Sequence, residues 1–524
     1  MRARALAFPL LVLAATAMGV ALRCQRVGEE SLWFDEALQV EWTDQPLLAF
    51  LLERWQQVDP PLNELIAWIW NNAMRATAPE LLRSELWVRL PGVLFGALTI
   101  PVVAFAARAA SGPAPGVIAA WLVATNPYLV RYSQEARMYA LTTLCAAAAL
   151  WGLVRAVGAE GKRRHVWCFG IFSIAAALSH FYAILVLGAA AAATAVAAWR
   201  ATRGTPLRDR LRYTPWPFRS LLTAEAAAIG ILLAYVGAAA IQVSASGQGT
   251  RPWLSSLGAP GVGTLSRAAA AYGSDFLGAY LPVLAPGTLD GGILWSALSG
   301  LALALLFGLA TRRPDEPAAL HSHLVAMALV PTILVVALSY IRPIYHVRYL
   351  MASLPAMVLV LARGRAWAAV ALLAAPAVLL GTVVQPRYHS WLEKPNYREA
   401  ARAFIEAYRA GDAIDVMLID RLPVRYYVRQ LAGPESPAYA AIDRAEEGRF
   451  ATLDPSSPGF VKKTAPPGGR RLVFDFTPAW GRLYAMDARA VLEARLAQGD
   501  PKAPGFELLF ASKPQPWFRL WSQN

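Results

Sequence analysis

Residues 5–22, ALAFPLLVLAATAMGVAL, decide the class of this chain, because an uncharged run of this length can cross a bilayer as one helix. Similar runs recur along the 524 residues, of which 56% are hydrophobic and only 16% are charged. A soluble domain rarely has that composition, so the sequence predicts a multispan membrane protein. The basic start resembles a secretory signal, but ALRC (21–24) offers no small-x-small cleavage site, and we expect the first helix to be retained.

The apolar runs predict eleven membrane-spanning helices. They cover residues 5–22, 91–107, 114–130, 139–155, 166–180, 181–199, 219–243, 293–310, 324–341, 349–362 and 366–384. One further segment, PPLNELIAWIWNNAMRA (60–76), is amphipathic, with Asn, Glu and Arg residues opposite its Leu and Ile residues. This pattern is typical of a helix that lies in the membrane interface.

The basic loops predict the orientation. With 60–76 in the interface and the N-terminus in the cytoplasm, the cytoplasmic side receives loops 155–165, 200–219, 311–316 and 363–365, which are rich in Arg and Lys. Such an excess is the rule for cytoplasmic loops, and it accounts for the net charge of +14 without nucleic acid as a partner. Loop 23–90 and the residues after 384 are then outside, which in a bacterium is the periplasm.

The composition changes after residue 384, where charge and proline rise and long apolar runs stop. Residues 396–412 have helical periodicity, as do residues 490–500, whereas AIDVMLID (413–420) and RRLVFDF (470–476) are typical of buried strands. Residues 506–522 predict a closing pair of strands. The sequence therefore predicts a transmembrane domain, 1–384, and a small α/β domain, 385–524, in the periplasm.

The stretch SLWFDEALQVEW (31–42) places two neighbouring carboxylates, Asp35 and Glu36, directly after the first span. Asp35 could be the N-cap of a short helix that begins near Glu36, because Asp caps well and the helix dipole favours Glu36. The same carboxylate could act as a general base. The other outer loops bear on the choice.

Three further outer segments carry ionisable and aromatic residues: RYSQEARMY (131–139), SHFY (179–182) and IRPIYHVRY (341–349). Such residues at membrane depth are costly and usually face a cavity. Carboxylate in one loop and Arg in two others fit an anionic lipid head group, since guanidinium binds phosphate in a bidentate fork and aromatic rings supply a platform. The candidates besides the two acids are Asp59, Arg131, Arg137, Tyr139, His180, His346, Arg348 and Tyr349.

The arginines and His180 also have structural explanations. Arg131 and Arg137 could extend to lipid phosphates or pair with Glu135. A buried histidine such as His180 more often packs than binds a ligand.

The remaining candidates have similar explanations. His346 and Arg348 could be interfacial anchors. Asp59 could mark only the start of the interfacial helix, since the following prolines suit a first turn. Because all of the candidates fall on one side of the membrane, we favour a binding site.

The ordered motifs resemble the C-type (GT-C) glycosyltransferases. The likeness covers about residues 5–360 and is carried by WFDEA (33–37), DPPLNELIAWIW (59–70), RLPGVLFGALTIPVVAFAAR (89–108), NPYLVRYSQEARMYAL (126–141), SHFYAILVL (179–187) and RYLMASLPA (348–356). Within these enzymes the chain is most similar to the glycosyltransferase family 39-like branch, which holds protein O-mannosyltransferases and the aminoarabinose transferase of lipid A.

The resemblance implies an inverting transferase that moves a sugar from a polyprenyl-phosphate donor to an acceptor hydroxyl on a protein, lipid A or a surface polysaccharide. The acid of the family's first loop corresponds to Asp35, with Glu36 beside it. Family members commonly have His or Lys before the Pro-Pro pair, where this chain has Asp59. The phosphate would then depend more on Arg137 and Arg348.

The residue types suggest a mechanism in which Asp35 accepts a proton from the acceptor and Glu36 orients the acceptor or the base. The two arginines stabilise the leaving phosphate, with Tyr139 and Tyr349 as helpers. Phosphate is a good leaving group, so no cofactor is required, although Asp35, Glu36 and His346 could hold a divalent metal ion.

The alternative function is a transporter, flippase or binding protein for a lipid-linked sugar, in contact with the same donor and with membrane lipids. It would use the same arginines but would not need a base. Transporters often show repeated halves, and this sequence shows no internal repeat.

Overall fold

The computed structural model describes residues 2–56, 60–158, 161–246, 318–339, 341, 347–363, 396–416, 418–444, 470–475, 507–511 and 519–523. The chain divides into two compact units. Unit 1 comprises Met1–Gln25, Leu47–Ile69 and Arg89–Trp391. Unit 2 comprises Arg26–Pro46, Trp70–Val88 and Leu392–Asn524, so it combines parts of the first outer loop with the C-terminal part of the chain.

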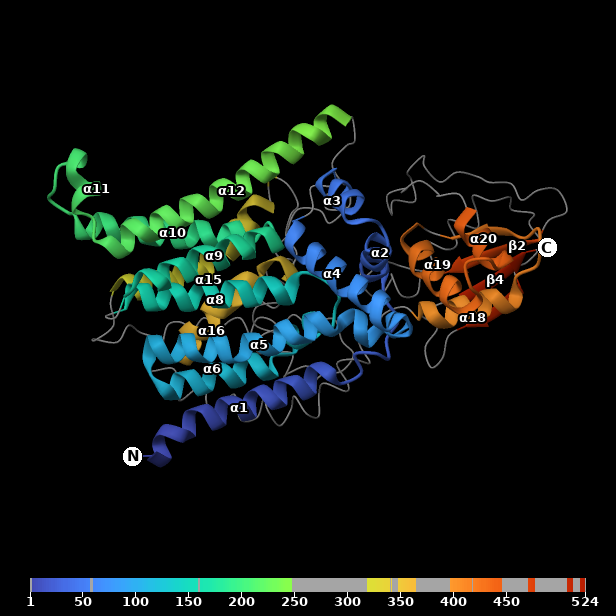
Figure 1. Cartoon of the computed structure of the whole chain (residues 1–524), viewed down its shortest axis with the longest axis horizontal. Coiled ribbons are helices and arrows are strands. Elements are labelled where there is room, and N and C mark those ends of the chain that lie inside the picture. The colour runs from blue at the N-terminus through green and yellow to red at the C-terminus, as the bar shows by residue number, and fades with distance from the viewer. Residues whose placement is uncertain are drawn as a thin grey trace. The chain divides into compact units, whose positions relative to one another are not determined.

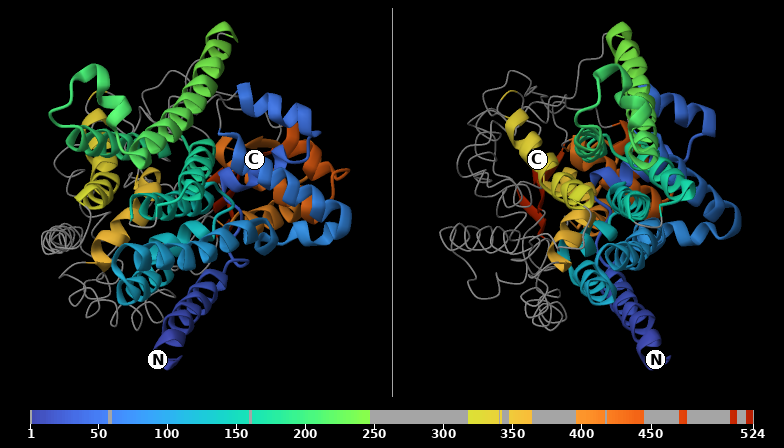
Figure 2. Two further views of the ribbon diagram at one scale, coloured as in Figure 1. Left: turned by 60° about the vertical axis from the view of Figure 1, so that its left-hand side comes forward. Right: turned by 90° about the vertical axis from the view of Figure 1, so that its left-hand side faces the viewer.

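Unit 1 is helical, and its helices pack side by side (Figures 1 and 2). The helices wholly within it are α1 (Arg2–Cys24), α3 (Leu47–Gln56), α6 (Pro113–Thr125), α7 (Pro127–Ser133), α8 (Tyr139–Val157), α9 (Arg163–Ser179), α10 (Ala183–Ala201), η2 (Leu207–Asp209), α11 (Arg210–Tyr213), α12 (Trp216–Ser246), α15 (Ala318–Ser339), η6 (Val347–Ser353) and α16 (Leu354–Ala362). The boundary between the units falls within α4 (Pro61–Thr77) and α5 (Glu85–Ser111).

Six helices in the described part of the chain are long and apolar enough to cross a membrane. They contain Leu6–Cys24, Glu85–Ser111, Tyr139–Val157, Ala183–Ala201, Trp216–Ala238 and Ala318–Val335. The chain is therefore a multi-pass membrane protein, as its sequence predicts. The predicted spans 293–310 and 366–384 lie outside the described residues, so the total of eleven stays a prediction.

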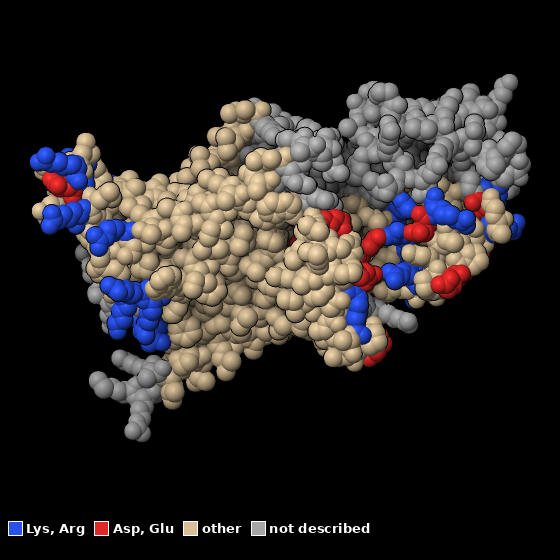
Figure 3. Space-filling model, turned by 45° about the horizontal axis from the view of Figure 1, so that its top comes forward, with Lys and Arg blue, Asp and Glu red and all other residues tan. Residues whose placement is uncertain are grey.

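The surface of unit 1 separates charge from apolar area. Arginines gather where η2 and α11 lie, and the sides of the neighbouring helices carry almost no charge (Figure 3). The exposed residues there include Arg200, Arg203, Arg208 and Arg212. This separation is typical of a protein with an apolar belt in the bilayer and basic residues at its edge.

The core of unit 1 centres on α8, because 78% of its apolar stretch is buried, more than in any of the other five spans. Helices α8 and α9 approach closely at Gly152, where a Cβ atom would lie 2.6 Å from the backbone nitrogen of Phe169. Small residues permit such close contact between membrane helices.

The predicted span 114–130 is two helices. Helix α6 ends at Thr125 and α7 begins at Pro127, with Asn126 between them in an extended conformation. A residue before proline is disfavoured in the α conformation, and the Asn126 side chain accepts a hydrogen bond from the Leu129 N–H at 2.9 Å. The single span predicted from hydropathy was wrong here because the Asn-Pro pair interrupts the helix.

The amphipathic segment 60–76 forms α4, as predicted, but its polar face is buried. Asn63, Glu64 and Asn71 are buried, whereas Ile69 is 55% exposed. The pattern correctly predicted two faces. It could not tell that the polar face would contact other protein groups instead of water.

Unit 2 contains α2 (Phe34–Trp42), η1 (Pro79–Arg83), α18 (Tyr397–Ala407), α19 (Leu418–Ala432) and α20 (Pro437–Arg444). It also contains a four-stranded sheet of β1 (Ala413–Asp415), β2 (Arg471–Asp475), β4 (Arg519–Gln523) and β3 (Glu507–Ala511), in the order β1-β2-β4-β3. Strand β1 is parallel to β2, and β4 is antiparallel to both β2 and β3. Strand β2 lies within the predicted strand 470–476, and β3 and β4 lie in the region of the predicted closing pair.

The strand predicted at 413–420 is mostly wrong. Strand β1 ends at Asp415 and α19 begins at Leu418. Val424, Tyr427 and Val428 are buried at helical spacing, and α19 packs against α18. Pro423 lies inside α19 and made the sequence unlike a helix. The helix predicted at 490–500 and the domain boundary near 384 lie outside the described residues.

Candidate active site

The acidic motif lies on α2, in unit 2. The backbone of Trp33 is extended at the N-cap, and the helix begins at Phe34. Asp35 and Glu36 therefore occupy the first turn, where the helix dipole favours negative charge. The interpretation of Asp35 as an N-cap was wrong, because the helix begins one residue before it.

The two carboxylates differ in their surroundings. The Glu36 side chain is fully buried, and its Oε2 accepts a hydrogen bond from the Trp33 N–H at 3.3 Å. Asp35 is only partly buried. Glu36 therefore contributes to the start of α2, and Asp35 is the carboxylate of the pair that is more accessible to a reacting hydroxyl.

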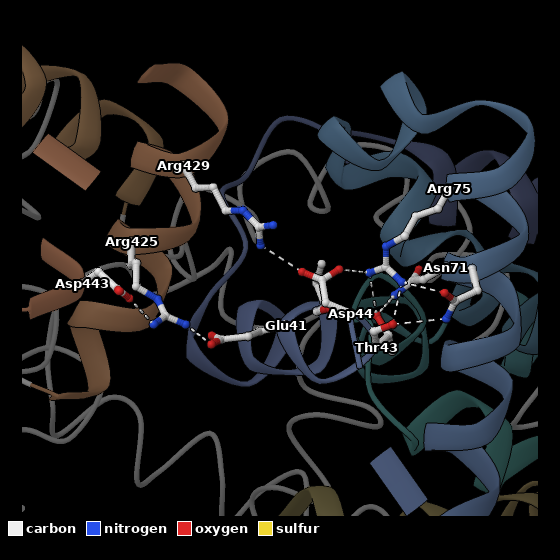
Figure 4. Close-up of polar contacts among 10 residues, drawn as sticks. Glu41, Thr43, Asp44, Asn71, Arg75, Arg425, Arg429 and Asp443 are labelled. Atoms are coloured by element: carbon white, nitrogen blue, oxygen red, sulfur yellow. Dashed lines mark hydrogen bonds and ion pairs between the residues drawn. The ribbon is translucent and has the colours of Figure 1, made fainter. Parts of the chain in front are cut away.

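A set of ion pairs surrounds the C-terminal end of α2 (Figure 4). Arg425 of α19 pairs with Glu41 and, at 2.6 Å, with Asp443. Asp44 pairs with Arg75 and, at 2.9 Å, with Arg429.

Hydrogen bonds from α4 complete this network. The Asn71 Nδ2 donates to the Thr43 hydroxyl at 2.9 Å, and Arg75 donates to the Thr43 carbonyl at 2.5 Å. Burial lowers the pKa of Arg75, which the nearby Asp44 carboxylate partly opposes. The end of α2 is thus held by oppositely charged and hydrogen-bonded groups.

In unit 1, aromatic residues from three predicted outer segments meet. Tyr139 begins α8, His180 lies in the turn between α9 and α10, and Tyr349 lies on η6. The His180 ring centroid is 5.8 Å from that of Tyr139 and 5.2 Å from that of Tyr349. Tyr182 adds a fourth ring, 4.4 Å from Tyr349. We call these four residues the aromatic cluster.

Arg348 lies against this cluster. Its guanidinium carbon is 5.8 Å from the Tyr139 ring centroid and 5.6 Å from the Tyr349 ring centroid. A cation at this distance is attracted by the negative face of an aromatic ring. Two of the residues predicted to help the arginines, Tyr139 and Tyr349, therefore do contact Arg348.

Arg137 and Arg131 have acidic neighbours. The Arg137 Nη1 is 4.0 Å from Glu64 Oε1, and both side chains are largely buried. The Arg131 Nε is 3.9 Å from Glu135 Oε1. The pairing of Arg131 with Glu135 is the structural explanation expected from the sequence, whereas the partner of Arg137 is a residue on α4.

The charges of Arg348 and Arg137 both act on the His180 ring. Burial, and then the positive charges of Arg348 and Arg137, lower the pKa of His180 to about 3. The ring is thus neutral at neutral pH, and its Nδ1 accepts a hydrogen bond from the Tyr182 N–H at 3.2 Å. Nε2 then carries the proton. Arg137 and Arg348 are therefore the two cations that act on this ring most strongly.

The structure does not place every candidate. Asp59 and His346 lie outside the described residues. In the part of the chain that is described, no three His, Cys, Asp or Glu side chains gather as metal ligands would. Asp35 and Glu36 belong to unit 2, and Arg131, Arg137, Tyr139, His180, Arg348 and Tyr349 belong to unit 1.

Sequence reasoning missed Glu64 and Tyr182 as members of the site. Glu64 was attributed to the polar face of an interfacial helix, and Tyr182 was part of the SHFY motif without a role of its own. Glu64 could have been identified only once α4 was known to lie beside the segment between α7 and α8 that carries Arg137.

Comparison with known proteins now bears on the site. Residues 66–222 match the family model for dolichyl-phosphate-mannose-protein mannosyltransferase. No curated protein matches the sequence. The fold is similar to the Archaeoglobus fulgidus oligosaccharyltransferase tethered with an acceptor peptide (TM-score 0.51, 14% identity, 99% of this chain and 74% of that one). These comparisons show that the chain has a fold similar to that of the oligosaccharyltransferase.

Two further solved structures are similar to this chain. One is the archaeal oligosaccharyltransferase AglB from Archaeoglobus fulgidus with an inhibitory peptide and a dolichol-phosphate (TM-score 0.51, 12% identity, 98% of this chain and 74% of that one). The other is ArnT from Cupriavidus metallidurans bound to undecaprenyl phosphate (TM-score 0.43, 13% identity, 98% and 97%).

The family match covers only part of the candidate site. Arg131, Arg137, Tyr139 and His180 lie within the matched residues 66–222, whereas Asp35, Arg348 and Tyr349 lie outside them. The roles of the individual residues therefore depend on their own chemistry.

Proposed function

We propose that this enzyme moves a sugar from a polyprenyl-phosphate donor to an acceptor hydroxyl with inversion at the anomeric carbon. The reaction takes place on the periplasmic face of the bacterial inner membrane. The acceptor is a protein, lipid A or a surface polysaccharide. The dolichol-phosphate bound to the structurally similar AglB supports the donor class.

One observation carries the proposal: the partly buried Arg348 lies against the rings of Tyr139 and Tyr349, which pack on His180, and Arg137 is also largely buried in this unit. Guanidinium binds phosphate through two parallel hydrogen bonds, and its attraction to the anion is stronger where water is scarce. Aromatic faces provide a surface for a sugar ring. The cluster is thus chemically suited to a sugar phosphate.

In the proposed reaction, the acceptor oxygen attacks the anomeric carbon while the bond from that carbon to the phosphate oxygen breaks. The electron pair of that bond leaves with the polyprenyl phosphate, whose charge Arg137 and Arg348 stabilise. Asp35 takes the proton from the acceptor, and Glu36 stabilises the start of α2 through its hydrogen bond with the Trp33 N–H. No cofactor is required for this chemistry, so EDTA treatment should leave turnover unchanged.

The test of the function is transfer by the purified full chain in lipid nanodiscs, supplied with polyprenyl-phosphate sugars one at a time. We expect one donor to yield free polyprenyl phosphate and a glycosylated acceptor. Mass spectrometry of envelope glycans from cells with and without the gene should show one missing sugar residue, which identifies both sugar and acceptor. If the envelope glycans are the same with and without the gene and the purified protein transfers no sugar, the proposed transferase activity is wrong.

The proposed orientation has its own test. A reporter fused after residue 210, among the basic residues near α11, should report the cytoplasm, and one fused after residue 450 should report the periplasm. The opposite result at both positions would reverse the membrane sides and place the reaction in the cytoplasm.

A further inference from the structure

The helix that carries Asp35 packs against α19, a helix almost 400 residues later in the sequence. Both belong to unit 2. A nine-residue helix such as α2 is too short to be stable alone in water, so its position depends on what it packs against. The contacts of α19 therefore decide where Asp35 lies within this unit.

The start of α2 is attached through Tyr427. The Tyr427 hydroxyl accepts a hydrogen bond from the Leu32 N–H at 2.7 Å and donates one to Glu85 Oε1 at 2.5 Å. Leu32 is three residues before Asp35, and the Tyr427 side chain is buried. One hydroxyl thus joins the residues before α2 to the first residue of α5.

The surroundings of this hydroxyl keep it in the donor form. Burial, and then the negative charge of Glu85, raise the pKa of Tyr427 well above its ordinary value. Glu85 also pairs with Arg398 of α18, and the Arg398 guanidinium lies 5.8 Å from the Tyr427 ring centroid. The arrangement is a closed set of hydrogen bonds and charges, which favours a single geometry.

The other end of α2 is attached to the same helix. Arg425 pairs with Glu41, and Arg429 pairs with Asp44, as Figure 4 shows. The two ends of a nine-residue helix are therefore held by residues within one stretch of α19, on either side of the carboxylate between them.

We propose that α19 positions the general base, with Tyr427 as the positioning residue at the start of α2. This inference rests on the proposed function, in which Asp35 takes the proton of the acceptor. A small displacement of a catalytic group can reduce turnover strongly, because the reacting atoms must be aligned when the proton moves. The C-terminal part of the chain would thus act on the reaction without touching the substrate.

The test variant is Tyr427→Phe, which removes the hydroxyl and keeps the ring. Tyr426→Phe is the matched control, because the neighbouring Tyr426 is a half-buried tyrosine whose hydroxyl bonds to Gln430 of the same helix. We expect Tyr427→Phe to lower kcat about tenfold with donor KM within about twofold of the wild type. Tyr426→Phe should match the wild type in both constants.

Hydrogen exchange followed by mass spectrometry supplies a readout that needs no activity. Tyr427→Phe should accelerate exchange of amides in residues 31–42, with exchange in α8 unchanged. Wild-type kcat and wild-type exchange in this variant would overturn the proposal. A variant in which kcat, donor affinity and the thermal midpoint all fall together would also overturn it, because that pattern indicates general destabilisation of the protein.

The same experiment separates this inference from the function on which it rests. If the wild type transfers no sugar from any donor, the proposed function fails, and the exchange of residues 31–42 still shows whether Tyr427 holds α2. If the wild type is active and Asp35→Asn is inactive while Tyr427→Phe is unaffected, the function stands and the positioning role is wrong.

Discussion

The ion pairs around α2 in unit 2 and the aromatic cluster in unit 1 both contact arginine side chains, but the surroundings of those arginines differ. Arg425, Arg429 and Arg75 each face a carboxylate in unit 2. In unit 1, Arg348 lies against the rings of Tyr139 and Tyr349. An arginine bonded to a carboxylate fixes the two elements that carry the partners, whereas an arginine against aromatic rings lies beside faces that can also hold a ligand.

The difference in partners predicts a difference in task. Ion pairs across unit 2 hold a helix, and substituting them should affect stability more than donor affinity. The aromatic cluster is suited to a ligand, and substituting Arg348 should affect donor affinity more than stability. Asp35 is the exception, because it lies on the helix that the ion pairs hold and is expected to act in the reaction.

The largest effect is expected for Asp35→Asn. Asn keeps the size of Asp but cannot accept the proton, so turnover should fall by about two orders of magnitude. Loss of the charge from the first turn should cost only about 0.3–1 kcal/mol of stability. The measurement is sugar transfer by purified protein, with donor binding in parallel. Glu29→Gln, an exposed residue of the same loop, is the control and should transfer normally. Wild-type turnover in Asp35→Asn would leave α2 as a structural helix only.

The second effect concerns His180 and pH. Below pH 6.5 the imidazole of an unfolded chain binds a proton, whereas the folded one stays neutral until about pH 3. Stability is therefore fully present above pH 6.5 and decreases as the pH falls toward 3. At pH 5 the loss is about 2 kcal/mol, at 1.36 kcal/mol per pKa unit.

The variant His180→Asn should remove this pH dependence, because Asn keeps an acceptor for the Tyr182 N–H but does not titrate. The measurement is the thermal midpoint of both proteins from pH 8 to pH 5. At pH 8 the imidazole is neutral in the folded and the unfolded chain, so the difference between the two midpoints there does not depend on protonation. If the wild type and the variant lose stability in parallel, Arg137 and Arg348 do not face a neutral ring.

The third effect separates the two regions directly. Arg348→Lys keeps the charge but loses the bidentate fork, so donor KM should rise about tenfold, which is about 1.4 kcal/mol. The thermal midpoint should change little. Arg155→Lys, in the last turn of α8, is the control. Unchanged donor KM in Arg348→Lys would favour an interfacial anchor over a phosphate ligand.

The smallest effect is expected in unit 2. Arg425→Gln removes a pair with Glu41 and one with Asp443, whose carboxylates are partly exposed, and should cost about 1 kcal/mol. That corresponds to a midpoint lower by about 2–4 °C. Donor KM should stay at the wild-type value. Arg429→Gln is the control, because Arg429 is half exposed and its pair should be worth less. A large change in donor KM would mean that this network also serves binding.

Much of the fold followed from local sequence patterns. The apolar runs predicted helices α1, α8, α9, α10, α12 and α15, because a bilayer requires about twenty apolar residues whose backbone groups are paired within the helix. The alternation of RRLVFDF predicted β2. Asp35, Arg137 and Arg348 were chosen because charge beside a membrane span is costly and needs a reason.

Other features depended on the environment of each residue. The start of α2 at Phe34 was missed, since Asp35 has the chemistry of a cap and Trp33 does not. Helix α19 was missed in part because its buried residues share a segment with Pro423. Glu64 was seen as polar but not as the neighbour of Arg137. In each of these cases the structure depends on a contact with another segment of the chain, which the local sequence does not reveal.

The sequence by itself determined that this chain spans a membrane several times, which loops carry its unusual charges, and which residue types are available for phosphate and proton transfer. Those properties depend on composition and on neighbours within a few turns of helix. Only the tertiary structure decided that Tyr139, His180 and Tyr349 meet, and that Tyr427, Arg425 and Arg429 hold the helix of Asp35. Contacts between residues hundreds of positions apart arise from packing, and packing is determined by all of the elements together.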